Sequence, residues 1–243
     1  MRVLVISDIH ANLAALEAVL ESAGEYDAVW CLGDLVGYGP NPNECIECVR
    51  SLPNLTCLVG NHDKAVLGDL DVNTFNNDAR YALLWTRQML KPQNKAYLHS
   101  LSPITEIEAF TLAHASPRHP VWEYILNRII AGENFSYFTT NYCLVGHTHV
   151  PVIYQESDLV DDCLEFLPNY ESPLQLDGER LIINPGSVGQ PRDANPNAAY
   201  AILDLEARTW QYRRAIYDVE RTQRQMRAHH FPERLVRRIA QGW

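Results

Sequence analysis

Continuous hydrophobic runs and helical repeats alternate along the first sixty residues. Residues 2–7 (RVLVIS) form a β-branched run typical of a buried strand, and similar runs lie at 28–32 and 55–59. Between these runs, residues 13–20 and 44–50 place apolar side chains at helical spacing. The order strand, helix, strand, helix, strand predicts right-handed crossovers and parallel pairing of the three strands.

The rest of the chain is richer in short strands. A helical pattern covers 74–90, and helical spacing returns from about 217 to the end. Further strands are expected at 109–113, 142–146, 151–154, 180–183, 199–205 and 208–213. This β-rich second half predicts a second sheet packed face to face on the first, with helices outside.

No linker or internal repeat interrupts the chain, so we expect a single domain over residues 1–243. Residues 155–179 are acidic and turn-rich without clear periodicity, and we interpret them as a surface insertion. Residues 217–243 form a basic helical tail.

Composition and charge narrow the class of protein. Hydrophobic residues make up 47% of the 243 residues, which is typical of a globular protein with a core. The net charge of −10 argues against a nucleic-acid polymer as partner, because such binding needs a basic surface. No apolar run approaches the ~20 residues that span a bilayer. The first residues lack the pattern of a secretory peptide, so we expect a cytoplasmic protein without membrane association.

The six cysteines do not form a disulfide framework in a chain of this size. Cys45 and Cys48 make a CxxC pair, but they lie in a helical pattern, and no second pair stands at zinc-site spacing. We therefore interpret this pair as structural.

Polar clusters follow the three strands expected in the first sixty residues: SDIH, GDLVGYG and GNHD. In parallel sheets the ligand crevice lies at the carboxyl ends of the strands, so these clusters should converge. His114 and the motif GHTH follow two later strands. The candidate ligands are Asp8, His10, Asp34, Asn61, His114, His147 and His149. Carboxylates and imidazoles suit Mn, Fe, Zn or Co, and a carboxylate such as that of Asp34 can bridge two ions through its two oxygens.

The motifs DxH, GD, GNHD, a histidine after a strand, and GHTH occur in this order, and the arrangement resembles the calcineurin-like metallophosphoesterases. The resemblance spans roughly residues 1–150 and the later NPGSVGQPR. It implies a four-layer α/β/β/α sandwich of two mixed β-sheets flanked by helices.

The same resemblance implies a dinuclear site for two divalent transition-metal ions. Manganese is the first expectation, with iron, zinc, nickel or cobalt as alternatives. One ion would take Asp8, His10, Asp34 and His149, and the other Asp34, Asn61, His114 and His147.

The resemblance further implies hydrolysis of a small phosphate ester by a water or hydroxide that bridges the two ions. His62 would protonate the leaving group or stabilise the phosphoryl charge, with Asp63 orienting its imidazole.

The segment after the GD motif indicates the branch of the family. Serine/threonine protein phosphatases and dinucleoside tetraphosphatases carry an arginine there, whereas this chain reads GDLVGYGPNP. Chain length and the NPGS element are similar to small bacterial and archaeal phosphodiesterases, so we expect a phosphodiesterase. A phosphomonoesterase or serine/threonine protein phosphatase on the same metals is the alternative. The non-enzymatic alternative is a metal-binding scaffold protein, like the retromer subunit that has this fold. The complete ligand set with His62 favours an enzyme.

Four further residues have two interpretations each. Arg192 in NPGSVGQPR can donate two hydrogen bonds to a phosphate or be solvated. Tyr38 and Asn12 are either substrate contacts or, respectively, a turn aromatic and a helix cap. His119 is either at the mouth of the site or in a surface loop.

The basic tail has three interpretations. Between Arg213 and Arg238 it holds eight arginines against three acidic residues, which indicates a solvated helix face. Alternatively, it docks on the acidic stretch 156–179 of the same or a neighbouring chain, which leaves a homo-oligomer open. Nucleic-acid binding by the tail is the third interpretation, which the net charge of −10 disfavours.

Overall fold

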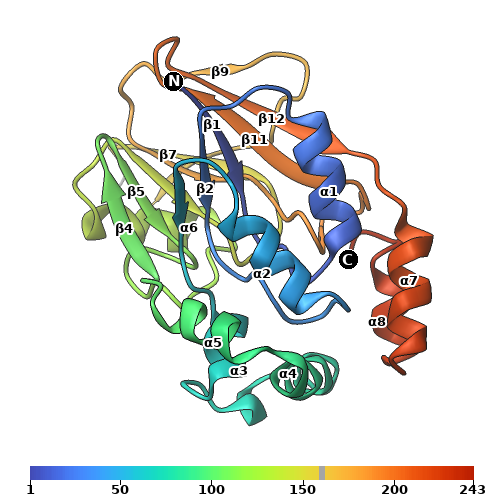
Figure 1. Ribbon diagram of the computed structural model, residues 1–243. Coiled ribbons are helices and arrows are strands. Elements are labelled where there is room, and N and C mark those ends of the chain that lie inside the picture. The colour runs from blue at the N-terminus through green and yellow to red at the C-terminus, as the bar shows by residue number, and fades with distance from the viewer. Residues whose placement is uncertain (159–161) are drawn as a thin grey trace.

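The computed structural model describes residues 1–158 and 162–243. Two six-stranded mixed sheets lie face to face, and helices cover their outer sides (Figure 1). The first sheet has the strand order β3-β2-β1-β11-β12-β9, and the second β4-β5-β6-β10-β7-β8. The four-layer α/β/β/α arrangement expected from the sequence is confirmed.

The first sheet joins strands from the two ends of the sequence. Its strands, in sheet order, are β3 (Leu55–Cys57), β2 (Ala28–Cys31), β1 (Arg2–Ile6), β11 (Ala198–Asp204), β12 (Thr209–Ala215) and β9 (Leu174–Gln175). The strands β1, β2 and β3 run parallel, as the crossovers predict. On its other side β1 pairs antiparallel with β11. β1 is therefore an internal strand.

The second sheet comes from the middle of the chain. Its strands, in sheet order, are β4 (Ile104–Ile107), β5 (Phe110–Ala113), β6 (Tyr142–Val145), β10 (Leu181–Asn184), β7 (Val152–Glu156) and β8 (Cys163–Phe166). The strands β5, β6 and β10 are parallel. The stretch 155–179 contributes β8 to this sheet and β9 to the first, and buries Cys163 and Leu176. Part of this stretch is thus built into the sheet edges.

Each face of the first sheet packs against a different layer. In β1, Val3 and Val5 face the second sheet in a cluster with Trp30 and Trp210. The alternate residues of β1, such as Leu4, pack in a separate cluster with the outer helices. Burial on both faces explains the continuous hydrophobic run of this strand.

The helices occupy the outer layers. They are α1 (Leu13–Ser22), α2 (Pro42–Arg50), α3 (Asn61–Leu67), α4 (Asn77–Met89), α5 (Pro92–His99), α6 (Arg128–Asn134), α7 (Val219–Ala228) and α8 (Glu233–Arg238), with 3₁₀ turns η1 (Val72–Thr74) and η2 (Phe135–Tyr137). The helices α1 and α2 cover the first sheet, and α6 packs on the second. No helix in the described ranges is long and apolar enough to cross a membrane. All six cysteines are free thiols, and Cys45 lies on the buried face of α2, in the core.

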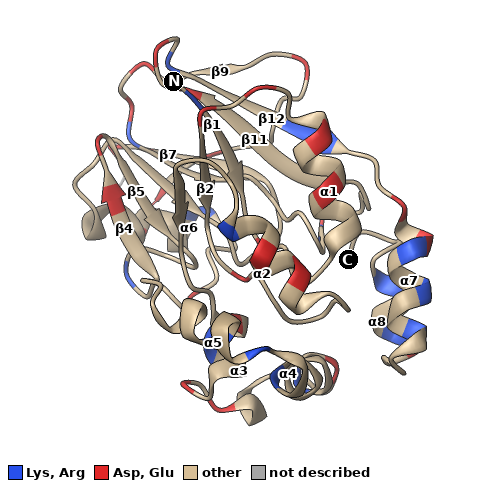
Figure 2. Ribbon diagram, in the orientation of Figure 1, with Lys and Arg blue, Asp and Glu red and all other residues tan. Residues whose placement is uncertain are grey.

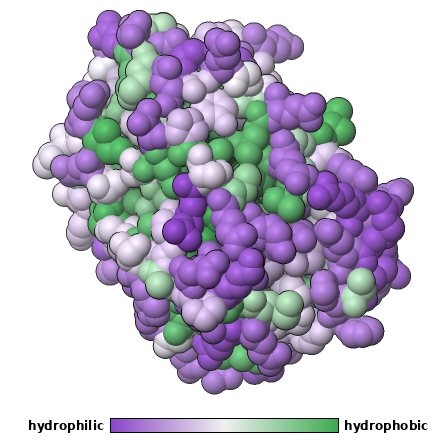
Figure 3. Space-filling model, viewed as in Figure 1, coloured by the Kyte–Doolittle hydropathy of each residue, from purple (hydrophilic) through white to green (hydrophobic). Residues whose placement is uncertain are grey.

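The helical tail packs on α1 and α4. Arg221 of α7 pairs with Glu17 at 2.6 Å, and Arg234 of α8 pairs with Asp78 at 3.4 Å. Docking of these helices on the acidic stretch of the same chain is therefore wrong. Arg214, which lies in β12 and not in α7 or α8, donates to the hydroxyl of Tyr170 in that stretch at 3.0 Å. The remaining face of α7 and α8 carries arginines and is hydrophilic (Figures 2 and 3).

Candidate functional site

All seven candidate ligands meet at one buried point. They lie on the turns after β1, β2, β5 and β6 and in the first turn of α3, and each is at most 2% exposed. Convergence at the carboxyl ends of parallel strands explains why positions so distant in sequence come together.

Three histidines direct their Nε2 atoms into the cluster. His10, His114 and His149 each donate Nδ1–H to a main-chain carbonyl, which leaves Nε2 as a lone-pair acceptor. The carbonyls belong to Val36, Leu32 and Gln190, at 3.1, 2.8 and 2.6 Å. The Nε2 atoms of His10 and His149 lie 3.0 Å apart. Two lone pairs at this distance repel each other unless a cation lies between them.

Asp34 stands between two sets of histidines. Its Oδ2 lies 3.6 Å from Nε2 of His10 and 3.5 Å from Nε2 of His114. This buried oxygen has no hydrogen-bond partner among the described residues, whereas Oδ1 accepts the main-chain N–H of His62 at 2.9 Å. The hydrogen bond to Oδ1 anchors the carboxylate, and Oδ2 is the oxygen that lies close to both sets of histidines.

The remaining ligands complete two groups. Oδ1 of Asp8 lies 3.4 Å from Nε2 of His149, and Oδ1 of Asn61 lies 3.2 Å from Nε2 of His114. The Nε2 of His147 is buried and has no hydrogen-bond partner within the described chain. The ligand atoms form compact triads, each within 4.8 Å: Asp8, His10 and His149, then Asp34, His114 and His147. These orphaned donor atoms fit divalent transition metals.

Burial sets the ionisation of the cluster. It raises the pKa of Asp8 to about 7 and the pKa of Asp34 well above its usual range. It also lowers the pKa values of His10, His147 and His149 well below theirs, so these imidazoles are neutral and able to ligate. Bound divalent cations would restore the charged form of the carboxylates.

The backbone at the ligands is strained. Five ligands adopt the left-handed region that non-glycine residues avoid: Asp8, His10, Asp34, His147 and His149, with φ of 53°, 47°, 53°, 63° and 63°. Gly60 allows the turn before α3 to approach this site closely, because a Cβ there would lie 2.0 Å from Oδ1 of Asp34. Such strain at several converging turns is typical of functional sites.

His62 lies at the edge of the cluster without a partner for Nδ1 among the described residues. Its ring packs 4.8 Å from His10, 4.5 Å from Tyr38 and 5.2 Å from Phe75, measured between centroids. A ligand atom of His62 also lies within 4.8 Å of ligand atoms of His10 and Asp34. His62 is therefore close enough to reach a group held at the cluster.

Asp63 does not orient the imidazole of His62. Its carboxylate accepts the main-chain N–H groups of Gly60, Val36 and Leu35 at 3.0, 3.1 and 3.3 Å. The expected contact to His62 is wrong, because the first turn of α3 directs Asp63 toward the turn after β2. Asp63 instead fixes that turn, which carries Asp34.

Two arginines flank Tyr38 beside His62. The guanidinium carbons of Arg192 and Arg238 each lie 5.8 Å from the centroid of the Tyr38 ring. Arg192 donates to Oε1 of Gln190 at 3.0 Å, and its buried Nε lacks a partner in the described chain. Arg238 belongs to α8 and was not a sequence candidate. His119 is exposed, in agreement with a surface loop.

Aromatic side chains form a rim that the sequence did not reveal. Tyr124 stacks on His147 with centroids 3.8 Å apart. Trp122 packs 5.1 Å from Phe75, which in turn contacts His62. Trp122 and Tyr124 remain 44% and 41% exposed, so part of each side chain is accessible to a ligand. The available signal was the aromatic segment PVWEYIL shortly after His114.

Residues 1–208 match the family model of the calcineurin-like phosphoesterase superfamily domain. The chain belongs to this superfamily. As a calcineurin-like phosphoesterase it is a phosphoric ester hydrolase of a family that uses divalent metals.

Several known proteins are similar to this calcineurin-like phosphoesterase. A metallophosphoesterase structure from Sphaerobacter thermophilus is 47% identical, with a TM-score of 0.92 and full coverage of both chains. An uncharacterized protein of Methanocaldococcus jannaschii is 38% identical over 98% of this chain and 97% of its own length. Phosphodiesterase YfcE of Escherichia coli is 27% identical over 84% of this chain and 88% of that protein.

Proposed function

We propose that this chain is a phosphodiesterase that hydrolyses a small phosphate ester with two divalent metal ions. The observation that carries the proposal is the unpartnered Oδ2 of Asp34 between two sets of inward-facing Nε2 atoms. One ion would be held by Asp8, His10, Asp34 and His149, and the other by Asp34, Asn61, His114 and His147. The phosphodiesterase assignment is supported by the relative of that name.

When bound, two such ions activate water and neutralise charge on the phosphoryl oxygens. The chain's own residues position the ester. His62 would contribute an N–H to a phosphoryl oxygen or a proton to the leaving oxygen. Arg192 would bind a further phosphoryl oxygen through its guanidinium group. Trp122 and Tyr124 would contact an aromatic leaving group.

Three finer assignments complete the proposal. Manganese is the first choice of metal, since N and O ligands of this type accept it. A cytoplasmic location is the second. The third is a single domain over 1–243, supported by the pairing of β1 with β11.

The test is a hydrolysis assay on metal-free protein reloaded with Mn, Zn, Ni or Mg. Bis(p-nitrophenyl) phosphate, p-nitrophenyl phosphate and a phosphoserine peptide would be compared. Metal-dependent turnover highest for the diester supports the proposal. Preference for the monoester or the peptide would move the function to a phosphomonoesterase or protein phosphatase. Stoichiometric binding of two ions without cleavage of any ester would favour a scaffold.

The variant His62→Gln tests the role of this residue. We expect kcat to fall about 10²- to 10³-fold while two metal ions remain bound by elemental analysis. An equal loss for a p-nitrophenyl and a methyl leaving group would indicate stabilisation of phosphoryl charge. A larger loss for the methyl ester would indicate protonation of the leaving group, which p-nitrophenolate does not need. Unchanged rates for both esters would remove His62 from the mechanism.

A further inference from the structure

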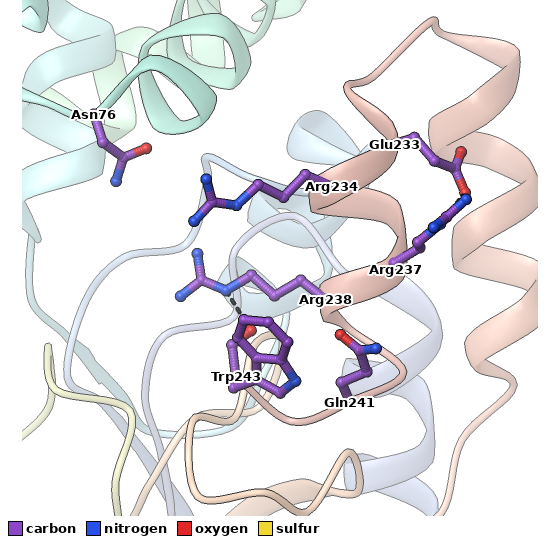
Figure 4. Close-up of a pocket in the computed structure, with 7 residues that line it drawn as sticks. All are labelled: Asn76, Glu233, Arg234, Arg237, Arg238, Gln241 and Trp243. Atoms are coloured by element: carbon purple, nitrogen blue, oxygen red, sulfur yellow. Dashed lines mark hydrogen bonds and ion pairs between the residues drawn. The ribbon is translucent and has the colours of Figure 1, made fainter.

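A pocket of about 670 Å³ opens between α8 and the start of α4 (Figure 4). Its lining residues are Asn76, Glu233, Arg234, Arg237, Arg238, Gln241 and Trp243. Three of these are arginines and one is a glutamate, so the lining is cationic although the whole chain carries a net charge of −10.

The three arginines do not point the same way. Arg234 and Arg238 extend from α8 toward Asn76 across the opening, whereas Arg237 and Glu233 lie on the other side of the helix (Figure 4). Arg237 pairs there with Glu233 at 3.3 Å. The guanidinium groups at the opening of the pocket are therefore those of Arg234 and Arg238.

These two groups differ in how far their charge is already balanced. Arg234 has Asp78 at 3.4 Å, and its side chain is 82% exposed, so solvent screens this ion pair. Arg238 donates from Nε to an oxygen of Trp243, the last residue of the sequence, so a carboxyl group already lies against it; it forms no ion pair with a carboxylate side chain in the described residues. Burial and the nearby charge of Arg192 lower the pKa of Arg238. Two like charges thus lie close to the Tyr38 ring, an arrangement that a bound anion would stabilise.

The buried ring of Tyr38 separates the pocket from the metal site. Arg238 lies against the Tyr38 ring, and this ring contacts His62 at 4.5 Å and His10 at 4.8 Å. A ligand that reached from the cluster past Tyr38 would meet Arg238 first and Arg234 beyond it. Asn76 faces these arginines and offers an amide donor, since its side-chain oxygen caps α4 through Ala79.

We propose that this pocket binds a second, non-reacting phosphate group of the substrate, held by Arg238 and Arg234 while the ester is cleaved at the metal site. The preferred substrate is then a diester with a distal phosphate, such as a phosphorylated nucleotide ester. This inference rests on the proposed function, because it assigns the substrate class of the same site. A guanidinium pair binds a phosphate dianion through charge-assisted hydrogen bonds.

The kinetic test compares two substrates that differ only in the distal group: the p-nitrophenyl diester of thymidine 5′-phosphate with and without a 3′-phosphate. We expect the extra phosphate to lower KM about tenfold in the native enzyme, with little change in kcat. In the double variant Arg234→Gln/Arg238→Gln this advantage should disappear. In the control Arg224→Gln it should persist, since Arg224 is an exposed α7 residue that pairs with Asp218 and Glu220. A KM advantage that survives in the double variant overturns the proposal.

A binding test separates this inference from the proposed function. Metal-free protein would be titrated calorimetrically with inorganic tripolyphosphate, and circular dichroism would verify that each variant is folded. Binding by native and Arg224→Gln protein, but not by the double variant, supports the pocket even if no ester is hydrolysed. Hydrolysis of the simple diester with equal tripolyphosphate binding in all three proteins rejects the pocket and leaves the phosphodiesterase intact.

Discussion

His10 and His149 face each other through lone pairs rather than through a hydrogen bond. Both Nδ1 atoms donate to main-chain carbonyls, so neither Nε2 carries a proton across the 3.0 Å that separates them. The same burial that makes these imidazoles neutral makes their contact unfavourable without a cation. Metal binding and folding stability are therefore coupled at these two residues.

This coupling predicts a metal-dependent melting temperature. Addition of a divalent ion at 100 times its Kd should stabilise the protein by about 2.7 kcal/mol, and His149→Ala should lose most of this gain. Differential scanning calorimetry with Mn or Zn against EDTA measures it. His119→Ala removes an exposed histidine outside the cluster and should keep the full response. An equal response in both variants would contradict the assigned ligand set.

The sequence predicted that the candidate ligands converge, and the structure brings them together, but the sequence did not predict all of their contacts. Positions such as Asp8 and Asp34 follow directly from strand order, because parallel strands present their carboxyl ends at one edge. The partners of Asp63 depend on which way the first turn of α3 faces, and no local pattern encodes that direction. The sequence did not single out Arg238. An arginine on an amphipathic helix fits the same hydrophobic pattern whether its side chain contacts solvent or a tyrosine that is distant in sequence.

Asn12 links three elements that are remote in sequence. Its Oδ1 caps α1 through the N–H of Ala15 at 3.3 Å and accepts from Oγ1 of Thr222 in α7 at 2.9 Å. Its Nδ2 donates to the carbonyl of Gly189 at 3.0 Å and to the hydroxyl of Tyr217 at 3.2 Å. Of the two sequence interpretations, the helix cap is confirmed, and the same side chain also holds the C-terminal helices.

The variant Asn12→Ala should therefore lower the free energy of unfolding by more than the loss of a helix cap alone. We expect the free energy of unfolding in urea to fall by about 2 kcal/mol, since buried partners on α7 and the Gly189 loop lose hydrogen bonds as well. Limited proteolysis should cleave within 217–243 sooner than in native protein. Asn127→Ala removes only the exposed cap of α6 and should leave that cleavage rate unchanged. Equal proteolysis of both variants would contradict the linking role.

The elements that sequence reasoning missed are short or contribute few buried residues. α5 buries only Asn94 and Leu98, and α6 buries only Ala131 and Asn134, too few to set up a helical repeat. β8 is exposed at three of its four residues, so its pattern resembles a loop. Such elements are stabilised by their neighbours rather than by their own periodicity.

At the scale of the whole molecule, a hydrogen-bond network centred on Glu123 connects the loop after β5 to α6. Glu123 accepts hydrogen bonds from Nε of Arg118 at 3.0 Å, Oγ of Ser116 at 2.7 Å and Nδ2 of Asn134 at 2.9 Å. Burial acts to raise the pKa of Glu123, but these bonds outweigh it and lower that pKa to about 2. The network therefore stabilises the folded state only to the extent that the carboxylate of Glu123 is ionised.

This predicts the acid side of the stability profile. A carboxylate with a depressed folded pKa contributes stability above its unfolded pKa of about 4.5, and loses it as pH falls toward 2. Glu123→Gln should therefore be less stable than native protein above pH 5, with a difference that narrows steadily between pH 5 and pH 3. Urea unfolding of the metal-free proteins at each pH measures this. A difference that stays constant over this range would show that Glu123 acts through packing alone.

The pairing of β1 with β11 bears on how the enzyme acquires its metal in a cell. The turn that carries Asp8 is bound by Ser187, Val188 and Gly189, and His149 is oriented by Gln190. A ribosome releases these segments long after β1 has emerged, so the nascent chain has no completed ion site until most of it has been synthesised. An ion held by these residues would therefore bind late in synthesis or after it, and its identity would follow the metals available to the chain at that stage.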